Sequence, residues 1–137
     1  MIDPATVLAY QQTEYRVLGD VPAVLQVGVR CAQLAILHQQ HHTDCSAFVT
    51  ACNPLGELLE APVNARRQAA LAQEISRQGR VAIAGMGQHP QGGWPPEPSF
   101  LVPGLTRAAA RQLGRRFEQN AILWSDADAV PQLILLR

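Results

Sequence analysis

The sequence predicts an α+β or α/β domain, in which a mixed β-sheet with terminal hairpins is covered by about three helices in a single-layer sandwich. Short apolar and β-branched runs alternate with segments of helical periodicity, in the order β-β-α-β-α-β-loop-β-α-β-β. Closely spaced strands stand at both ends of this order, and no linker divides the chain. A length of 137 residues is typical of one domain, so we expect residues 1–137 to fold as a single domain.

The first half is predicted to open with a short helical or irregular segment and a hairpin. Strands over 13–18 and 24–28 flank the turn signal Gly19-Asp20. Apolar residues at helical spacing then predict a helix over 31–41. A buried strand over 45–52 ends at Asn53-Pro54, because proline cannot continue a central strand.

The second half is predicted to contain two helices around a long irregular segment. Asn64 is expected to cap a helix that Gly79 ends, and Thr106 to cap another. The predicted elements are, in order, a helix over 65–78, strands over 81–84 and 99–102, a helix over 107–117, and a hairpin of strands over 121–124 and 132–136. The segment 85–98 between them is rich in Gly and Pro, and long loops in compact domains are usually functional or disordered.

The composition excludes several classes of protein. Eleven basic and eleven acidic residues cancel, which disfavours nucleic-acid binding because no positive excess is available for phosphates. No run approaches the roughly 20 apolar residues of a membrane span, and the N-terminus does not resemble a signal peptide. The three cysteines form no CxxC pair, which is typical of a reducing compartment, so we expect a cytoplasmic protein.

The charged fraction is low and the hydrophobic fraction is ample for a core. Charged residues make up 16% of the chain and hydrophobic residues 47%, against a usual charged share of about 25%. Low charge on a small domain favours a surface that is covered by a partner, with a second copy of the chain as the simplest choice.

Polar residues follow or precede several apolar elements and predict a candidate site. If the strand that contains Ser99 runs antiparallel to the strand that ends before Asn53, then Asn53, Glu97 and Ser99 meet at one rim of the sheet, where Asn120 and Arg66 complete the set. Carboxylate, hydroxyl and carboxamide groups in one place predict binding of a small polar or anionic ligand. Glu97 is the only candidate for a general base.

The same residues also have structural explanations. Asn before Pro is common in turns, Asn64 is explained as a cap, and Glu97 is able to lock the loop by pairing with an arginine such as Arg66. These explanations predict a structural or protein-interaction domain without catalytic activity. The sequence leaves open whether the chain is an enzyme.

No metal or cofactor site is expected. His38 and His42 stand four residues apart near Cys45, but a fourth ligand is not evident, and the helix dipole also favours histidines in a last turn. Gly85-Met86-Gly87 follows a predicted strand, yet the helix that a nucleotide-binding loop requires does not follow it.

Four runs of the sequence resemble a known family. They are Thr50-Ala51-x-Asn53-Pro54, Asn64 at the opening of a helix, Gly87-x-x-Pro90-x-Gly92-x-Trp94-x-x-Glu97-Pro98-Ser99-Phe100, and Gly114-Arg115-Arg116-Phe117-x-Gln119-Asn120-Ala121. Together they resemble a bacterial domain-of-unknown-function family, number 3293. The resemblance implies a bacterial, cytoplasmic, stand-alone domain, and it brings no activity, cofactor or catalytic residue. The chain departs from the pattern at Cys52, where a larger residue is expected, and at Glu118, where glycine is expected.

Overall fold

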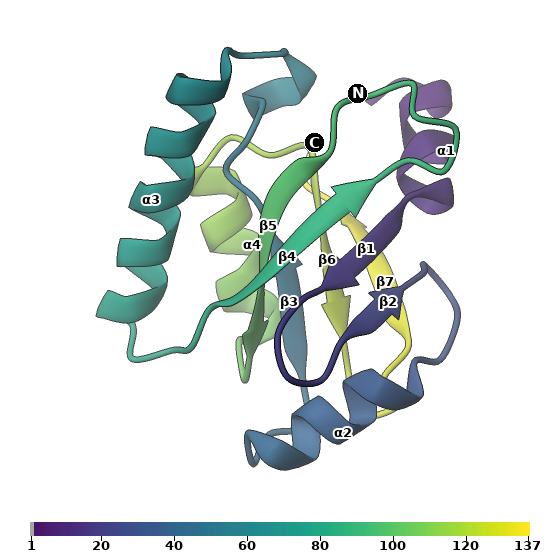
Figure 1. The fold of residues 1–137 in the computed structure, drawn as a ribbon, viewed down its shortest axis with the longest axis vertical. Helices are drawn as coiled ribbons and strands as arrows, with labels where there is room; N and C mark the ends of the chain where they lie inside the picture. The colour runs from purple at the N-terminus through teal and green to yellow at the C-terminus, as the bar shows by residue number, and fades with distance from the viewer. Residues whose placement is uncertain (1) are drawn as a thin grey trace.

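A single curled sheet of seven strands forms the centre of the protein (Figure 1). The computed structural model describes residues 2–137. The helices in that range are α1 (Pro4–Gln12), α2 (Ala32–Gln40), α3 (Ala61–Arg77) and α4 (Arg107–Arg116), with a short 3₁₀ turn, η1 (Pro54–Gly56). The strands are β1 (Glu14–Val17), β2 (Ala23–Leu25), β3 (Ser46–Val49), β4 (Ile83–Gln88), β5 (Glu97–Pro103), β6 (Ala121–Ser125) and β7 (Pro131–Leu135).

The α+β class and both terminal hairpins are confirmed. The strand order is β2-β1-β4-β5-β3-β6-β7, and every neighbouring pair is antiparallel, whereas the sequence predicted a mixed sheet. The reason lies in the helical connections, of which α2 joins β2 to β3 across three intervening strands. Helix α3 joins β3 to β4 and α4 joins β5 to β6, and in each case another strand lies between the two that are joined. Consequently no parallel pair forms.

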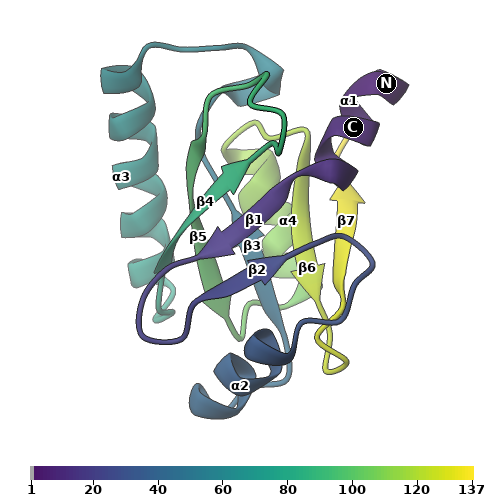
Figure 2. The same cartoon turned by 45° about the vertical axis from the view of Figure 1, so that its right-hand side comes forward.

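Alternate residues of the strands belong to two separate hydrophobic cores, one on each face of the sheet. On the outer face, Ala47 and Val49 of β3 pack with apolar residues of α3 and α4. On the inner face, Phe48 packs with Leu101, Leu123 and the buried side of α2. The period of two along β3 therefore places one helix pair outside the curl and α2 at one of its ends (Figure 2).

The curl is closed at the α2 end and open at the other. The N–H of Gly28, just after β2, donates to the carbonyl oxygen of Pro131 at the start of β7 (2.8 Å). The N–H of Cys31 donates to the carbonyl oxygen of Ala129 (2.9 Å). These bonds join the two edges of the sheet. At the opposite end the edges separate, and α1 lies beside the end of β7 (Figure 2).

Several boundaries differ from the predictions: β2 ends at Leu25 and not at residue 28, β3 ends at Val49 and not at residue 52, and two further differences bear on the candidate site. Helix α3 begins at Ala61 after Glu60, so Asn64 lies within its first turn and is not its cap. Strand β4 extends to Gln88 and β5 begins at Glu97, so the irregular segment is shorter than 85–98. Pairing with β1 and β5 on both sides keeps the glycine-rich end of β4 extended, although glycine disfavours strands.

The predicted helix ends are otherwise confirmed. Gly79 has φ +74° and follows α3, and the N–H of Arg80 donates to the carbonyl oxygen of Ile75, as in a Schellman motif. The side chain of Thr106 accepts a hydrogen bond from the N–H of Ala109. Within residues 2–137, no helix combines the length and the apolar character needed to cross a membrane.

Candidate functional site

A cavity of about 450 Å³ opens at the unclosed end of the curled sheet. Its apolar floor includes Phe48, Leu123 and Leu133 from the inner face of the sheet. One side is formed by α1, which contributes Ala9 and Tyr10. The opposite side is polar and lies where β3 and β5 meet.

A glycine in the middle of a cross-strand row makes room for the cavity. Tyr15 of β1, Gly87 of β4 and Glu97 of β5 are directly paired, so they share the inner face. A Cβ atom at Gly87 would meet nothing closer than the Tyr15 ring at 3.8 Å. The position between the Tyr15 ring and Glu97 is therefore empty of side chain.

Gly85, two residues earlier in β4, lies beneath a side chain and not beneath a vacant space. A Cβ atom at Gly85 would come within 2.7 Å of the Phe48 ring and of the Arg16 carbonyl oxygen. Phe48 thus occupies the space above Gly85, and its ring also meets the Tyr15 ring edge-on, with centroids 5.5 Å apart. One glycine admits a core side chain, and the other leaves a vacant slot.

Glu97 is the principal polar group of the cavity. Its Oε2 accepts hydrogen bonds from Nδ2 of Asn53 (2.7 Å) and from the indole Nε1 of Trp94 (3.2 Å). Its Oε1 accepts no hydrogen bond from residues 2–137. Burial raises the pKa of the Glu97 carboxyl, while the two donors act in the opposite direction. Among residues 2–137, no arginine and no other acid lines the cavity.

The orientation of the Asn53 amide follows from a backbone donor. The N–H of Leu59 lies 3.0 Å from one side-chain atom of Asn53, and because an N–H only donates, that atom is the oxygen. The backbone N–H of Asn53 lies 2.9 Å from one side-chain atom of Asn64, which by the same reasoning is Oδ1. The other side-chain atom of Asn64 is therefore Nδ2, and it donates to Oδ1 of Asn53 (2.8 Å). Nδ2 of Asn53 is therefore the atom that faces Glu97, and the carboxylate accepts.

Helices α3 and α4 hold the segment that carries Asn53. Arg67 donates from Nε to the carbonyl oxygen of Ala51 and from Nη2 to that of Phe117, both at 2.7 Å. Gln119 donates from Nε2 to the carbonyl oxygen of Cys52 at 3.1 Å. Asn53 itself adopts a left-handed conformation, with φ +50°. Side chains thus satisfy backbone groups of this segment that no strand partner reaches.

Two tyrosines attach α1 to the sheet. The hydroxyl of Tyr15 donates to the backbone carbonyl oxygen of Tyr10 (2.7 Å), and Nδ2 of Asn120 donates to the Tyr10 hydroxyl (3.3 Å). Burial raises the pKa of both tyrosines, and the charge of Glu97 raises it further. No residue of α1 is fully buried, so these bonds account for much of its attachment.

Four of the five predicted site residues line this cavity. They are Asn53, Glu97, Ser99 and Asn120. The Ser99 hydroxyl donates to the backbone carbonyl oxygen of Glu97 at 3.0 Å. The antiparallel pairing of β3 with β5, on which the prediction depended, is confirmed.

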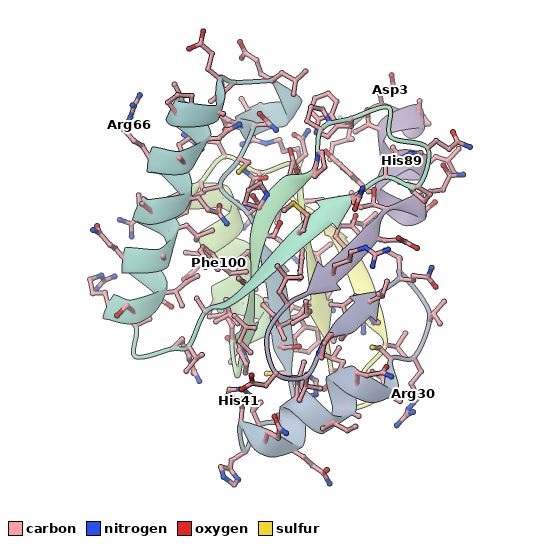
Figure 3. All side chains as sticks on the ribbon, in the orientation of Figure 1. Asp3, Arg30, His41, Arg66, His89 and Phe100 are labelled. Atoms are coloured by element: carbon pink, nitrogen blue, oxygen red, sulfur yellow. The ribbon has the colours of Figure 1, made fainter. Side chains whose placement is uncertain are left out.

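The fifth residue, Arg66, lies elsewhere. It is exposed on α3 and points away from the sheet (Figure 3), so it neither lines the cavity nor pairs with Glu97 as the sequence suggested. The following residue, Arg67, is the one that turns toward the sheet. Sequence reasoning also missed Tyr10 and Tyr15, because only the curl of the sheet brings α1 over its inner face.

The histidine-rich segment lies at the closed end of the sheet. Nε2 of His38 lies 2.8 Å from Oγ of Ser46, and burial lowers the pKa of the imidazole. The thiol of Cys45 donates to the carbonyl oxygen of Leu105 (3.5 Å). In the described range, no three His, Cys, Asp or Glu side chains are grouped as metal ligands would be. His89, by contrast, lies at the cavity near α1 (Figure 3).

The two adjacent arginines of α3 provide a test of the loop anchor. We expect Arg67→Met to lower the free energy of unfolding by about 2 kcal/mol, because two backbone carbonyls lose a charged donor. Arg66→Met is the matched control and should change it by less than about 0.5 kcal/mol. Urea denaturation of the three proteins measures the difference. Equal stability of both variants would contradict the assigned role of Arg67.

The partly buried carboxyl of Glu97 predicts a pH-dependent stability difference. Because the folded pKa is raised, the contribution of Glu97 is greatest below the unfolded pKa and is lost as the pH rises through the folded value. Glu97→Gln keeps an acceptor for Asn53 and removes this loss. We therefore expect the variant to equal or exceed the wild type in stability at pH 7.

The same comparison at acid pH isolates the titration. The advantage of Glu97→Gln should shrink as the pH falls toward 4, where the wild-type carboxyl is protonated. Denaturation curves of both proteins across this range measure it. The opposite result would be a Glu97→Gln variant whose stability relative to the wild type falls as the pH rises from 4 to 7. That result would show that the folded protein favours the ionised form of Glu97.

Comparison with known proteins identifies a family. No curated protein and no solved structure gives a significant match to the chain. The family described as "Protein of unknown function (DUF3293)" matches residues 49–122, which is more than half of the chain. The matched segment contains Asn53, Arg67, Glu97 and Asn120. The resemblance seen in the sequence is confirmed, and the chain belongs to the DUF3293 family.

Proposed function

We propose that the cavity binds a small organic ligand, with Glu97 as its polar anchor. The observation that carries the proposal is a carboxylate in a mostly apolar cavity, with one oxygen, Oε1, that has no protein donor in the described chain. Glu97 is partly buried, and an accepting oxygen without a protein donor beside a vacant space is what a ligand donor would complete.

The arrangement also distinguishes ligand binding from a purely structural role. The hydrogen bond from Asn53 would hold the start of β5 equally well if residue 97 were glutamine, because the amide oxygen also accepts. Burial of a carboxylate is unfavourable unless it is paired. The presence of an acid at this partly buried position is explained if its charge or its second oxygen has a ligand.

The size and lining of the cavity fit a small molecule. A volume of about 450 Å³ lies within the range of roughly 300–1,000 Å³ that is usual for such sites. Phe48, Tyr10 and Trp94 provide aromatic surface, and Glu97 and Asn120 provide a few convergent polar groups. This combination is typical of pockets in which apolar contact supplies affinity and polar groups fix the orientation of the ligand.

Filling the slot above Gly87 tests the proposal. Gly87→Val places methyl groups in the cavity, and its Cβ makes only ordinary van der Waals contacts, since the nearest atoms lie at 3.8 Å or more. We expect the variant to fold and to lose binding, because the added side chain occupies the space of the ligand. Compounds from a small-molecule library that raise the melting temperature of the wild type should have no such effect on Gly87→Val.

The matched control is Gly93→Val. A Cβ atom at Gly93 would meet nothing within 4 Å, and Gly93 does not line the cavity, so binding should persist. A compound at about 100 times its dissociation constant stabilises the protein by about 2.7 kcal/mol, which a thermal-shift assay resolves. Compounds that stabilise Gly87→Val as strongly as Gly93→Val would place their site outside the cavity and overturn the proposal.

A further inference from the structure

The charges around the cavity are unbalanced. The chain has no lysine, and its eleven basic residues are all arginines, none of which lines the cavity. Arg16, on the outer side of β1, binds Glu14 at 2.6 Å, and Arg67 is engaged by two carbonyl oxygens. Glu97, which is partly buried, therefore forms no salt bridge with an arginine of residues 2–137.

The two donors that do reach Glu97 leave one side of it open. Asn53 and Trp94 both donate to Oε2, and both are neutral. Oε1 retains its full capacity to accept, and a charge-assisted hydrogen bond to it would be stronger than a neutral one. The complementary group of a ligand is thus a donor, and a positively charged donor would also neutralise the carboxylate.

The aromatic lining suits a cation as well. Tyr10, Tyr15, Phe48 and Trp94 all contribute to the cavity, and the Trp94 indole is within hydrogen-bond distance of the carboxylate. The faces of aromatic rings attract cations, and most strongly when water is excluded. An anion, in contrast, would meet the charge of Glu97 with no arginine among residues 2–137 in the cavity to offset it, and His89 is the one basic side chain of those residues in the lining.

Resting on the proposed function, we propose that the ligand is a small organic cation, in which an ammonium or amidinium group binds Oε1 of Glu97 and an apolar body occupies the slot above Gly87. The proposal assigns the polar contact to one atom and the apolar contact to one vacant position. It specifies the class of the ligand, whereas the proposed function requires only that a ligand binds in the cavity.

Three probes of nearly equal shape separate the possibilities. Benzamidine is cationic at neutral pH, benzamide is neutral and benzoate is anionic. Binding is followed by the indole N–H resonances in ¹H–¹⁵N spectra, because Trp94 donates to Glu97 whereas Trp124 donates to the carbonyl oxygen of Leu105, away from the cavity. A probe in the cavity should shift the Trp94 resonance and leave that of Trp124 unchanged.

We expect benzamidine to bind about tenfold more tightly than benzamide, which is the ratio expected when a charge-assisted hydrogen bond replaces a neutral one. Benzoate should bind most weakly. In Glu97→Gln, the preference for benzamidine over benzamide should disappear, and the amide spectrum of the variant verifies that it is folded. Gly87→Val should abolish binding of both probes.

The outcomes distinguish this proposal from the proposed function. If benzamide or benzoate shifts Trp94 as effectively as benzamidine, and Gly87→Val blocks them, the cavity binds ligands but the cationic class is wrong. If the preference for benzamidine survives in Glu97→Gln, Glu97 is not the recognising group. If benzamidine leaves Trp94 unshifted at about 10 mM, a concentration at which a fragment of its size should bind, the proposal is also overturned.

Discussion

The hydrogen bond from Asn53 to Glu97 joins the two parts of the structure. On one side, Asn53 is fixed by the N–H of Leu59 and by Asn64, so its amide has a single orientation. On the other side, that orientation presents an N–H to Oε2 of Glu97 at 2.7 Å, at the start of β5. The segment after β3, the first turn of α3 and the polar side of the cavity therefore depend on one another, and a change at Asn53 would be felt in all three.

The two glycines of β4 determine what the curled sheet encloses. Strong curvature brings side chains of the inner face close together, and Gly85 relieves that crowding by admitting the Phe48 ring. Gly87 stands one row further along the same face, where no side chain takes the space. The cavity is thus the continuation of the core beyond the last side chain that fills it, which explains why its floor is apolar and its rim is polar.

The sequence predicted the α+β class and brought together Asn53, Glu97, Ser99 and Asn120, because strand alternation and the antiparallel pairing of neighbouring segments are local patterns. It chose Arg66 over Arg67, since neighbouring helix positions are distinguished only by which face the sheet covers. The strand character of Gly85-Met86-Gly87 comes from pairing on both sides, which composition does not reveal. At Glu118, where the family resemblance implies glycine, φ is +59°, a conformation that glycine adopts without strain.

The proposed site depends on a partly buried Glu97 carboxyl whose Oε1 has no protein donor among residues 2–137, and the most direct measurement is the titration of this side-chain carboxyl by ¹³C NMR in the ligand-free protein. Burial opposes ionisation more strongly than Asn53 and Trp94 favour it. The account predicts a pKa clearly above the ordinary glutamate value of about 4.3. A pKa at or below that value would mean that the carboxylate is solvated or already paired, and would contradict the account.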